Sequence, residues 1–280
     1  ASTHRVMLTR VLPRRLVRAC AAARGPRRRF SSSYYDSQSG QHVQRVDGLL
    51  FHELSLTDSP SVGRSQLSQS SVGARLSSFE LPLGAFSNEA MVGLPTAYAR
   101  LTEQEHTLEA VGRCAELGVG ASLSLQVGLG LAADAAITKV IRFAEAAAES
   151  GAGGVPIRVC LLDALGHSSP GRVELVCAKL ADAGVAVLTL GAAGGQESDV
   201  DGMEELVEAL ILADVVGAPM QDRVGLRAPA SGAAAERLCA RAMELGVRRF
   251  DTHISGGEDG PPNPARLAAI AQGLGLKVAL

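Results

Sequence analysis

Residues 157–190 carry one complete unit of a pattern that recurs along the chain, IRVCLLDALGHSSPGRVELVCAKLADAGVAVLTL. The unit starts with an apolar run at 157–162 and continues with apolar residues at helical spacing over 170–183. Gly184 follows, and glycine favours the left-handed conformation that ends many helices because it has no β-carbon. A second apolar run occupies 185–190. The unit therefore predicts a strand, a helix and a second strand.

The same pattern extends outward from this unit in both directions. Strands are predicted at 49–56, 76–83, 92–98, 121–127, 157–162, 185–190, 223–226 and 248–254. Helices are predicted between most of them, at 103–117, 132–149, 170–183, 202–216 and 233–245. A βα unit of roughly 25 to 30 residues, repeated eight times, has the length of an α/β protein of the (β/α)8 TIM-barrel class. We therefore expect residues 45–280 to form such a barrel.

A doubly wound open sheet is the alternative fold. It usually has a glycine-rich phosphate-binding turn after its first strand, and residues 56–60, LTDSP, cannot form one. The barrel has one expected irregularity. Only about 15 residues separate Asp58 from the second strand, so its first helix should be short or missing.

Composition excludes several classes of protein. The chain has 280 residues, of which 46% are hydrophobic and 20% charged, as expected for one large globular domain. No apolar run approaches the roughly 18 to 20 residues of a membrane span.

The cysteines form no C-x-x-C pair, so neither a zinc knuckle nor a disulfide framework is predicted, and we expect buried thiols. They are Cys20, Cys114, Cys160, Cys177 and Cys239.

The amino-terminal segment differs in charge from the remaining chain. Nine arginines and no lysine precede the first acidic residue, Asp36, and serines follow at 31–33. Such a basic, serine-bearing segment, able to form an amphipathic helix, is typical of a mitochondrial transit peptide. We assign residues 1–44 to a transit peptide and a polar linker, and expect the chain in the mitochondrial matrix. A plastid address and a retained arm that contacts RNA or a lipid surface are the alternatives.

The remaining chain is acidic. Removing the nine arginines changes the formal net charge from −2 to −11. Because contacts to phosphate need Lys and Arg on the folded surface, we expect no nucleic-acid binding by the barrel.

Chemistry in such barrels occurs at the carboxyl ends of the strands. The carboxylates predicted there, Asp58 and Glu80, could bind a cation or act as acid and base, or could be salt-bridged structural groups. His52 and His253 lie on strand runs and are more simply explained as hydrogen-bonded core residues. Other side chains expected at these ends are Thr57, Gln126, Asp163, His167 and those of 227–231 and 253–259.

Several motifs together resemble 3-hydroxy-3-methylglutaryl-CoA (HMG-CoA) lyase and its metal-dependent barrel relatives. The first strand contributes ELSLTD at 53–58 and the second FE at 79–80. The carboxyl half contributes DALGH at 163–167, LTLG at 188–191, AMELGVRRFD at 242–251, ISGG at 254–257 and AQGLGL at 271–276. The order and spacing of these motifs agree over the whole barrel.

The resemblance implies a reaction in which a divalent metal holds the hydroxyl and carboxylate of the substrate. A base then removes the hydroxyl proton, and a carbon–carbon bond breaks to give acetyl-CoA and acetoacetate. The family takes its metal ligands from an Asp, an H-x-H pair and an Asn. The Asp corresponds to Asp58 and the Asn to Asn263, whereas the two His positions fall on Arg227 and Pro229.

Neither Arg227 nor Pro229 can donate a lone pair to a metal. A guanidinium about 4 Å from a divalent ion would also repel it by about 8 kcal/mol at an effective dielectric constant near 20. Glu80 matches the family's Glu on the second strand, but other functional positions have changed. The family's Arg falls on Thr57, its Asp on Ala192, and its loop Cys on Gly260 or Glu258.

We therefore expect a catalytically inactive relative, a pseudoenzyme kept as a structural, assembly or ligand-binding component. The alternative is an active carbon–carbon lyase of the HMG-CoA lyase type on a rebuilt site. Its candidate residues are Asp58, Glu80, Asp163, His167 and His253. No cofactor is expected for the first hypothesis, whereas the alternative implies Mg²⁺ or Mn²⁺. We expect partners among the proteins of a mitochondrial assembly, and acyl-CoA is a possible ligand. The apolar helix at 204–216 is most simply a well-buried outer helix of the barrel, and the alternative is that it also contacts a partner.

Overall fold

The structure is a computed structural model of the whole chain. It describes residues 33–36, 41–44, 49–54, 76–86, 96–128, 130–149, 155–165, 169–192, 200–212, 223–228, 232–253 and 261–276. The chain divides into two compact units, Ala1–Gln44 and Arg45–Leu280.

The first unit contains a short antiparallel strand pair. Strand β1, Ser33–Asp36, pairs with β2, Gln41–Gln44, so that Ser33 lies opposite Gln44. Sequence analysis assigned these residues to a polar linker and did not predict the strands.

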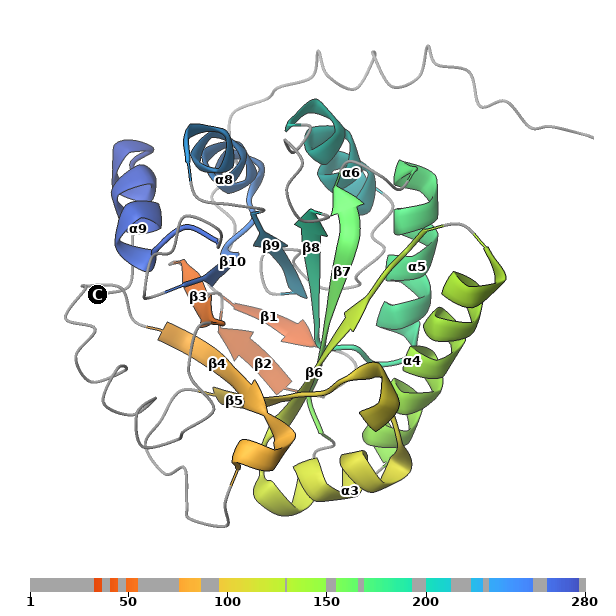
Figure 1. Cartoon of the computed structure of the whole chain (residues 1–280). Coiled ribbons are helices and arrows are strands. Elements are labelled where there is room, and N and C mark those ends of the chain that lie inside the picture. The colour runs from red at the N-terminus through yellow and green to blue at the C-terminus, as the bar shows by residue number, and fades with distance from the viewer. Residues whose placement is uncertain are drawn as a thin grey trace, which may run out of the picture. The chain divides into compact units, whose positions relative to one another are not determined.

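The second unit is a closed barrel of eight parallel strands (Figure 1). The barrel order is β10-β3-β4-β5-β6-β7-β8-β9, so the last strand pairs with the first and no sheet edge remains. The predicted TIM barrel is confirmed, and the open-sheet alternative is wrong. The strands are β3 Leu50–Glu53, β4 Leu76–Pro82, β5 Thr96–Arg100, β6 Gly120–Leu125, β7 Ile157–Leu165, β8 Val187–Ala192, β9 Val224–Arg227 and β10 Arg249–Thr252.

An α-helix follows each barrel strand from β5 to β10. The α-helices are α3 Leu108–Leu117, α4 Leu131–Glu149, α5 Pro170–Asp182, α6 Val200–Leu212, α8 Ala233–Leu245 and α9 Pro264–Gly273. Two short 3-10 helices, η1 Leu83–Ala85 and η2 Glu103–Glu105, precede β5 and α3 respectively. The five predicted helices correspond to α3, α4, α5, α6 and α8, and α9 is an additional one. The predicted start at 103–105 is the separate 3-10 helix η2, and the predicted end at 213–216 lies outside the described residues. The expected loss of the first helix concerns residues that lie outside the described ranges.

Helix ends follow the local chemistry of the sequence. The Thr107 hydroxyl oxygen accepts a hydrogen bond from the Ala110 amide and caps α3. Gly118 and Gly246 end α3 and α8 in the left-handed conformation, with φ of 65° and 104°. Each of these glycines leads into a strand of the barrel, as expected for a glycine that ends the helix of a βα unit.

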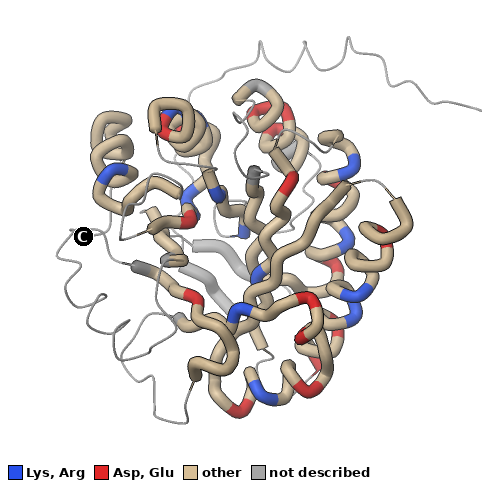
Figure 2. The backbone as a smooth tube through the Cα atoms, viewed as in Figure 1, with Lys and Arg blue, Asp and Glu red and all other residues tan. Residues whose placement is uncertain are grey.

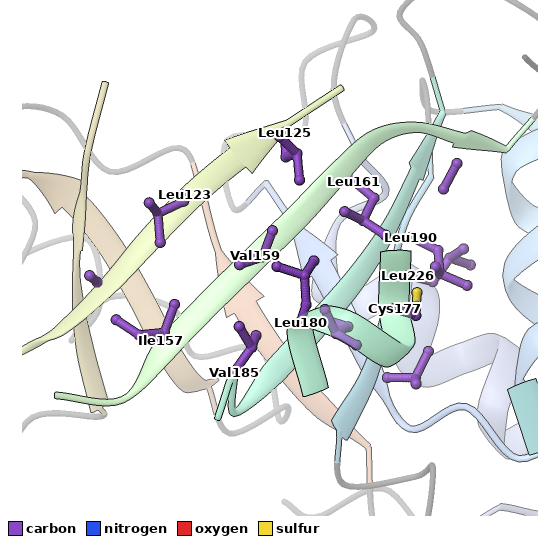
Figure 3. Close-up of a cluster of buried hydrophobic side chains, with 14 of the residues drawn as sticks. Leu123, Leu125, Ile157, Val159, Leu161, Cys177, Leu180, Val185, Leu190 and Leu226 are labelled. Carbon is purple, nitrogen blue, oxygen red and sulfur yellow. The ribbon is translucent and has the colours of Figure 1, made fainter. Parts of the chain in front are cut away.

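The apolar core lies between the strands and the helices. Alternate strand residues point outward, and those of neighbouring strands meet the inner faces of the helices. Figure 3 shows this packing around Leu161 on β7 and Leu180 on α5. It also labels Leu123, Leu125, Ile157, Val159, Cys177, Val185, Leu190 and Leu226.

Two expectations from composition are also met where they can be examined. None of the described helices is both long and apolar enough to cross a bilayer. Cys114, Cys160, Cys177 and Cys239 are buried and free, as expected, and Cys20 lies outside the described residues.

Candidate functional site: a charged network inside the barrel

The inward faces of the barrel strands are polar. Figure 2 shows charged positions within the ring of strands as well as on the surrounding helices. TIM barrels usually fill this space with branched apolar side chains. Here the buried polar residues on these faces are His52, Ser78, Glu80, Ser122, Arg158, Thr189 and Asp251, whereas the buried Thr252, next to Asp251, lies on the opposite face of β10.

Glu80 lies at the centre of one half of this network. The Ser122 hydroxyl donates to Glu80 Oε2 at 2.6 Å, and His52 Nε2 lies 3.4 Å from the same oxygen. His52 Nδ1 lies 2.7 Å from Ser78 Oγ. This arrangement fits a neutral imidazole that accepts from Ser78 and donates to Glu80.

Asp251 lies at the centre of the other half. Arg158 Nη2 donates to Asp251 Oδ1 and, at 2.9 Å, to Thr189 Oγ1. Arg227 Nε donates to Asp251 Oδ2 at 2.6 Å. Both oxygens of this carboxylate are therefore held by guanidinium groups.

Arg158 joins the two halves. Its Nη1 lies 3.6 Å from Glu80 Oε2, and Arg100 at the barrel rim lies 3.9 Å from Glu80 Oε1. The buried groups form an alternating set of charges, with the carboxylates Glu80 and Asp251 balanced by the guanidinium groups of Arg158 and Arg227. Because unpaired charges are costly in a barrel interior, this balance is what makes their burial possible.

The protonation states follow from burial and pairing. Burial by itself would raise the pKa of Glu80, but the hydrogen bond with His52 and the charge of Arg158 outweigh it and lower that pKa. Burial likewise opposes ionisation of Asp251, yet Arg158 and Arg227 lower its pKa. For His52, burial and then Arg158 lower the pKa below 6.5, which keeps the imidazole neutral.

Arg227 and Cys160 face the same interior. Although burial alone would lower the pKa of Arg227, Cys160 and Asp251 raise it above its ordinary value, and the guanidinium stays charged. Burial raises the pKa of the Cys160 thiol to about 11. Since the thiolate is the nucleophilic form, Cys160 is inert near neutral pH.

Below the charged groups, the barrel is tightly filled. Tyr98 packs edge-on against His52, with 5.7 Å between ring centroids. A β-carbon at Gly120 would lie 2.6 Å from the Tyr98 ring and 2.7 Å from the Pro156 carbonyl oxygen, so only glycine fits there. A void bordered by His52, Tyr98 and Arg158 measures about 10 Å³, close to the space one water needs.

Some of the predicted site residues are described by the structure and others are not. Those outside the described residues are Asp58, Thr57, Pro229, His167, Gly260 and Glu258. Glu80 is described and is only 4% exposed.

Asn263, the position expected to match a metal-binding Asn, caps α9. Its Oδ1 accepts from the Ala265 amide at 2.7 Å. The sequence contains Pro264 directly after it, which fits the first helical position because proline needs no amide partner there.

Arg227 has a partner that sequence analysis did not identify, because Asp251 pairs with its charge. Both oxygens of Asp251 are held by guanidinium groups, so this carboxylate is not free to hold a cation. Within the described ranges, no group of three or more His, Cys, Asp or Glu side chains could hold a metal ion. The described residues therefore do not fit a divalent metal.

Asp163 and Gln126 lie beside the carboxyl end of β6. The Val127 amide donates to Asp163 Oδ1 at 2.6 Å, and Arg172 Nε donates to the Val127 carbonyl at 3.0 Å. Asp163 thereby fastens the loop after β6 to β7. His253 follows β10 and is partly buried.

Sequence analysis missed the two residues that organise the network. Arg158 interrupts the apolar run at 157–162, and Asp251 sits between Phe250 and Thr252 on β10. A charged residue inside an otherwise buried strand was the available signal, because a strand of such a barrel can bury it only if a neighbouring strand supplies a partner. His52 was expected to be a hydrogen-bonded core residue, and this is confirmed.

The same fold occurs in solved structures of other proteins. No family model and no curated protein matches the chain. Among solved structures, an HMG-CoA lyase from Acinetobacter baumannii, in complex with coenzyme A and 3-methylmalate, aligns with TM-score 0.65 and 14% identity, over 84% of this chain and 86% of that one.

Two other structures extend the comparison. The carboxyl transferase domain of Rhizobium etli pyruvate carboxylase aligns with TM-score 0.60 and 14% identity, over 84% of this chain but 44% of that one. The amino-terminal domain of a putative aldolase from Bacteroides vulgatus gives 0.53 and 15%, over 82% of each chain. The chain therefore has the TIM-barrel fold that these lyase and aldolase-like proteins share.

Proposed function

We propose that this protein is a non-catalytic barrel of the HMG-CoA lyase type, retained as a structural, assembly or ligand-binding component of mitochondria. The observation that carries the proposal is the ion pair between Arg227 and Asp251, in which Arg227 Nε donates to Asp251 Oδ2 at 2.6 Å. Arg227 occupies one of the two positions where the resemblance implies a metal-binding histidine.

The state of the carboxylates supports the absence of metal-dependent lyase chemistry. A divalent ion takes about six ligands, largely oxygen. Asp251 gives both of its oxygens to Arg158 and Arg227, and Glu80 Oε2 accepts from Ser122. Binding a cation there would require these pairs to break inside the barrel, which would leave guanidinium charges unpaired.

The acid–base properties of Glu80 point the same way. A general base works best with a pKa near the operating pH. The pKa of Glu80 lies below its ordinary value, and the side chain is almost fully buried. It is therefore a weak base with little access to a substrate proton.

The first experiment measures metal and turnover. We expect purified full-length protein to hold no stoichiometric Mg²⁺ or Mn²⁺ by elemental analysis and to release no acetoacetate from HMG-CoA. The combined variant Arg227→His, Pro229→His and Thr57→Arg introduces the residues that the resemblance implies at these positions. It tests whether their replacement in this chain removed the lyase activity. Bound metal in the native protein, with turnover lost in Asp58→Asn, would establish the alternative, an active carbon–carbon lyase.

Localisation needs a separate experiment. The arginine-rich segment supports the mitochondrial part of the proposal, so a fluorescent protein fused to residues 1–44 should enter mitochondria. Replacing Arg27, Arg28 and Arg29 with Gln should reduce import, and targeting to plastids or retention in the cytosol would contradict this part.

A structural role further predicts that the native protein migrates with a larger assembly in native gels, and a free monomer throughout would count against it.

A further inference from the structure

A groove lies between the start of α3 and the outer face of α4, away from the barrel interior. These two helices are neighbours in Figure 1. The groove has a volume of about 560 Å³, within the range of small-molecule sites. Its lining residues are His106, Thr107, Leu108, Asp134, Ala135, Thr138, Lys139, Arg142 and Phe143.

His106 is the unusual residue of this groove. It is 7% exposed, and its ring packs against Phe143 with 6.0 Å between centroids. Its Nε2 is buried and finds no hydrogen-bond partner among the residues that the structure describes. Since most buried polar atoms are paired, an unpaired one at the wall of a groove needs an explanation, and a bound ligand would provide its partner.

The same histidine borders a second cavity of about 540 Å³ on the barrel side. This cavity reaches the carboxyl end of β6 at Ser124 and Gln126. Lys139 also borders both cavities, and its Nζ donates to the Glu103 carbonyl at 2.5 Å. His106 and Lys139 therefore form the wall between the groove and the mouth of the barrel.

The charges in the groove favour an anion. Its one acidic residue, Asp134, is paired with Arg172 at 2.5 Å. Nearby, the Glu105 carboxylate accepts from the Thr102 amide and hydroxyl. The cations Lys139 and Arg142 are thus not offset by a carboxylate within the groove itself.

Other groove residues favour an apolar portion in the ligand. Leu108 is 73% exposed, although large apolar side chains are normally covered, and Phe143 forms part of the floor. Burial, followed by the charge of Lys139, lowers the pKa of His106, so its imidazole is neutral at pH 7. A neutral imidazole can donate to or accept from a polar group of the ligand.

We propose that this groove binds a small amphipathic anion, with a carboxylate or phosphate group at Lys139 and Arg142 and an apolar body against Leu108 and Phe143. His106 Nε2 bonds a polar atom of the ligand. The proposal concerns the outer helices and does not rest on the state of the Arg227–Asp251 pair, so it can fail while the proposed function stands, or the reverse.

Calorimetric titration of the full chain tests the ligand chemistry. The probes are octanoate, octyl phosphate, 1-octanol and inorganic phosphate. We expect one or both octyl anions to bind, and 1-octanol and inorganic phosphate to bind at least about tenfold more weakly, because each lacks one of the two kinds of contact. The preferred octyl anion identifies the head group. No binding of either octyl anion at millimolar concentration, or equal binding of 1-octanol, would overturn the proposal.

Matched variants test the location. Arg142→Gln should weaken binding of the preferred anion about tenfold, whereas Lys179→Gln, which removes a similar exposed charge from α5, should leave it unchanged. His106→Leu should weaken binding and yet raise the melting temperature of the free protein, because it removes the unpaired buried nitrogen. Equal affinities of Arg142→Gln and Lys179→Gln, or a lower melting temperature with unchanged affinity in His106→Leu, would show that the groove is not the site.

Discussion

The two faces of the barrel strands differ in chemistry. On β7, Val159 and Leu161 point outward into the apolar layer, whereas Arg158 points inward to Asp251. On β9, Leu226 belongs to the apolar layer, and Arg227 next to it belongs to the charged network. Alternation along a strand places the two faces only one residue apart.

The outward apolar side chains and the inward charged side chains contribute differently to the barrel. Burial of the outward side chains contributes about 25 cal/mol per Å² of apolar surface. The inward charges gain much less, because their mutual attraction must first offset the loss of hydration. The outer layer therefore supplies most of the stability, while the interior holds a specific arrangement of charges that fails if one member is removed.

The largest expected effect comes from breaking the interior network. Arg158→Met should destabilise the protein by about 3 to 5 kcal/mol, because it leaves buried carboxylates without their partner. Urea unfolding measures this. The double variant with Asp251→Asn should cost clearly less than the sum of the two single variants, and strict additivity would show that the two residues do not interact.

Truncation in the outer layer should have a comparable or slightly smaller effect. Leu161→Ala removes a fully buried side chain and should cost about 3 kcal/mol. Leu175→Ala on α5, where the side chain is 51% exposed, is the matched control and should change stability by less than about 0.5 kcal/mol. Equal losses at both positions would contradict the described helix packing.

Acidification should destabilise the protein first through its two buried histidines, His52 and His106. The folded-state pKa values of His52 and His106 lie below 6.5, so the unfolded chain binds protons first. Stability present above pH 6.5 is therefore lost as the pH falls below that value. Below about pH 4.5 the lowered pKa values of Glu80 and Asp251 add a further loss in the same direction.

Urea midpoints at pH 7.5 and 5.5 measure the histidine part. His52→Gln should show a smaller drop between the two pH values than the native chain. Glu80→Gln should keep or enlarge the drop, because Glu80 raises the pKa of His52 and its own carboxyl titrates at lower pH. A midpoint in the native chain that rises on acidification would show that His52 is protonated when folded.

The smallest effect is expected on the surface. Arg241 on α8 bridges to Glu204 on α6, and the two side chains are 33% and 31% exposed. Glu204→Gln should cost less than about 1 kcal/mol, because solvent screens such pairs. A change as large as that of Arg158→Met, measured by the same unfolding assay, would remove the distinction between interior and exterior charges.

Much of the fold was predictable because hydrophobic periodicity records the outward face of each element. The runs at 157–162 and 185–190 and the helix between them were placed correctly on that basis. Helix α9 was missed, although Asn263 and Pro264 form a standard helix start. The strand pair β1 and β2 was missed because polar residues conceal its alternation.

The site was less predictable. Glu80 was identified from its place at the end of a predicted strand and Arg227 through the family resemblance, but their partners come from strands far apart in sequence. Nothing local in residues 249–252 indicates that Asp251 meets both Arg158 and Arg227, since the pairing depends on the register between strands. Charge pairs of this kind become visible only when the barrel closes.

Closure of the barrel also constrains how the chain reaches this state. The Thr252 hydroxyl donates to the His52 carbonyl across 200 sequence positions, where β10 meets β3. During synthesis, β3 must therefore keep an unpaired edge until β10 has left the ribosome. Loss of the chain from residue 249 onward would remove β10 and open the ring between β9 and β3. A nonsense codon just before residue 249 would thus abolish the barrel, although all the other strands of the barrel would have been made.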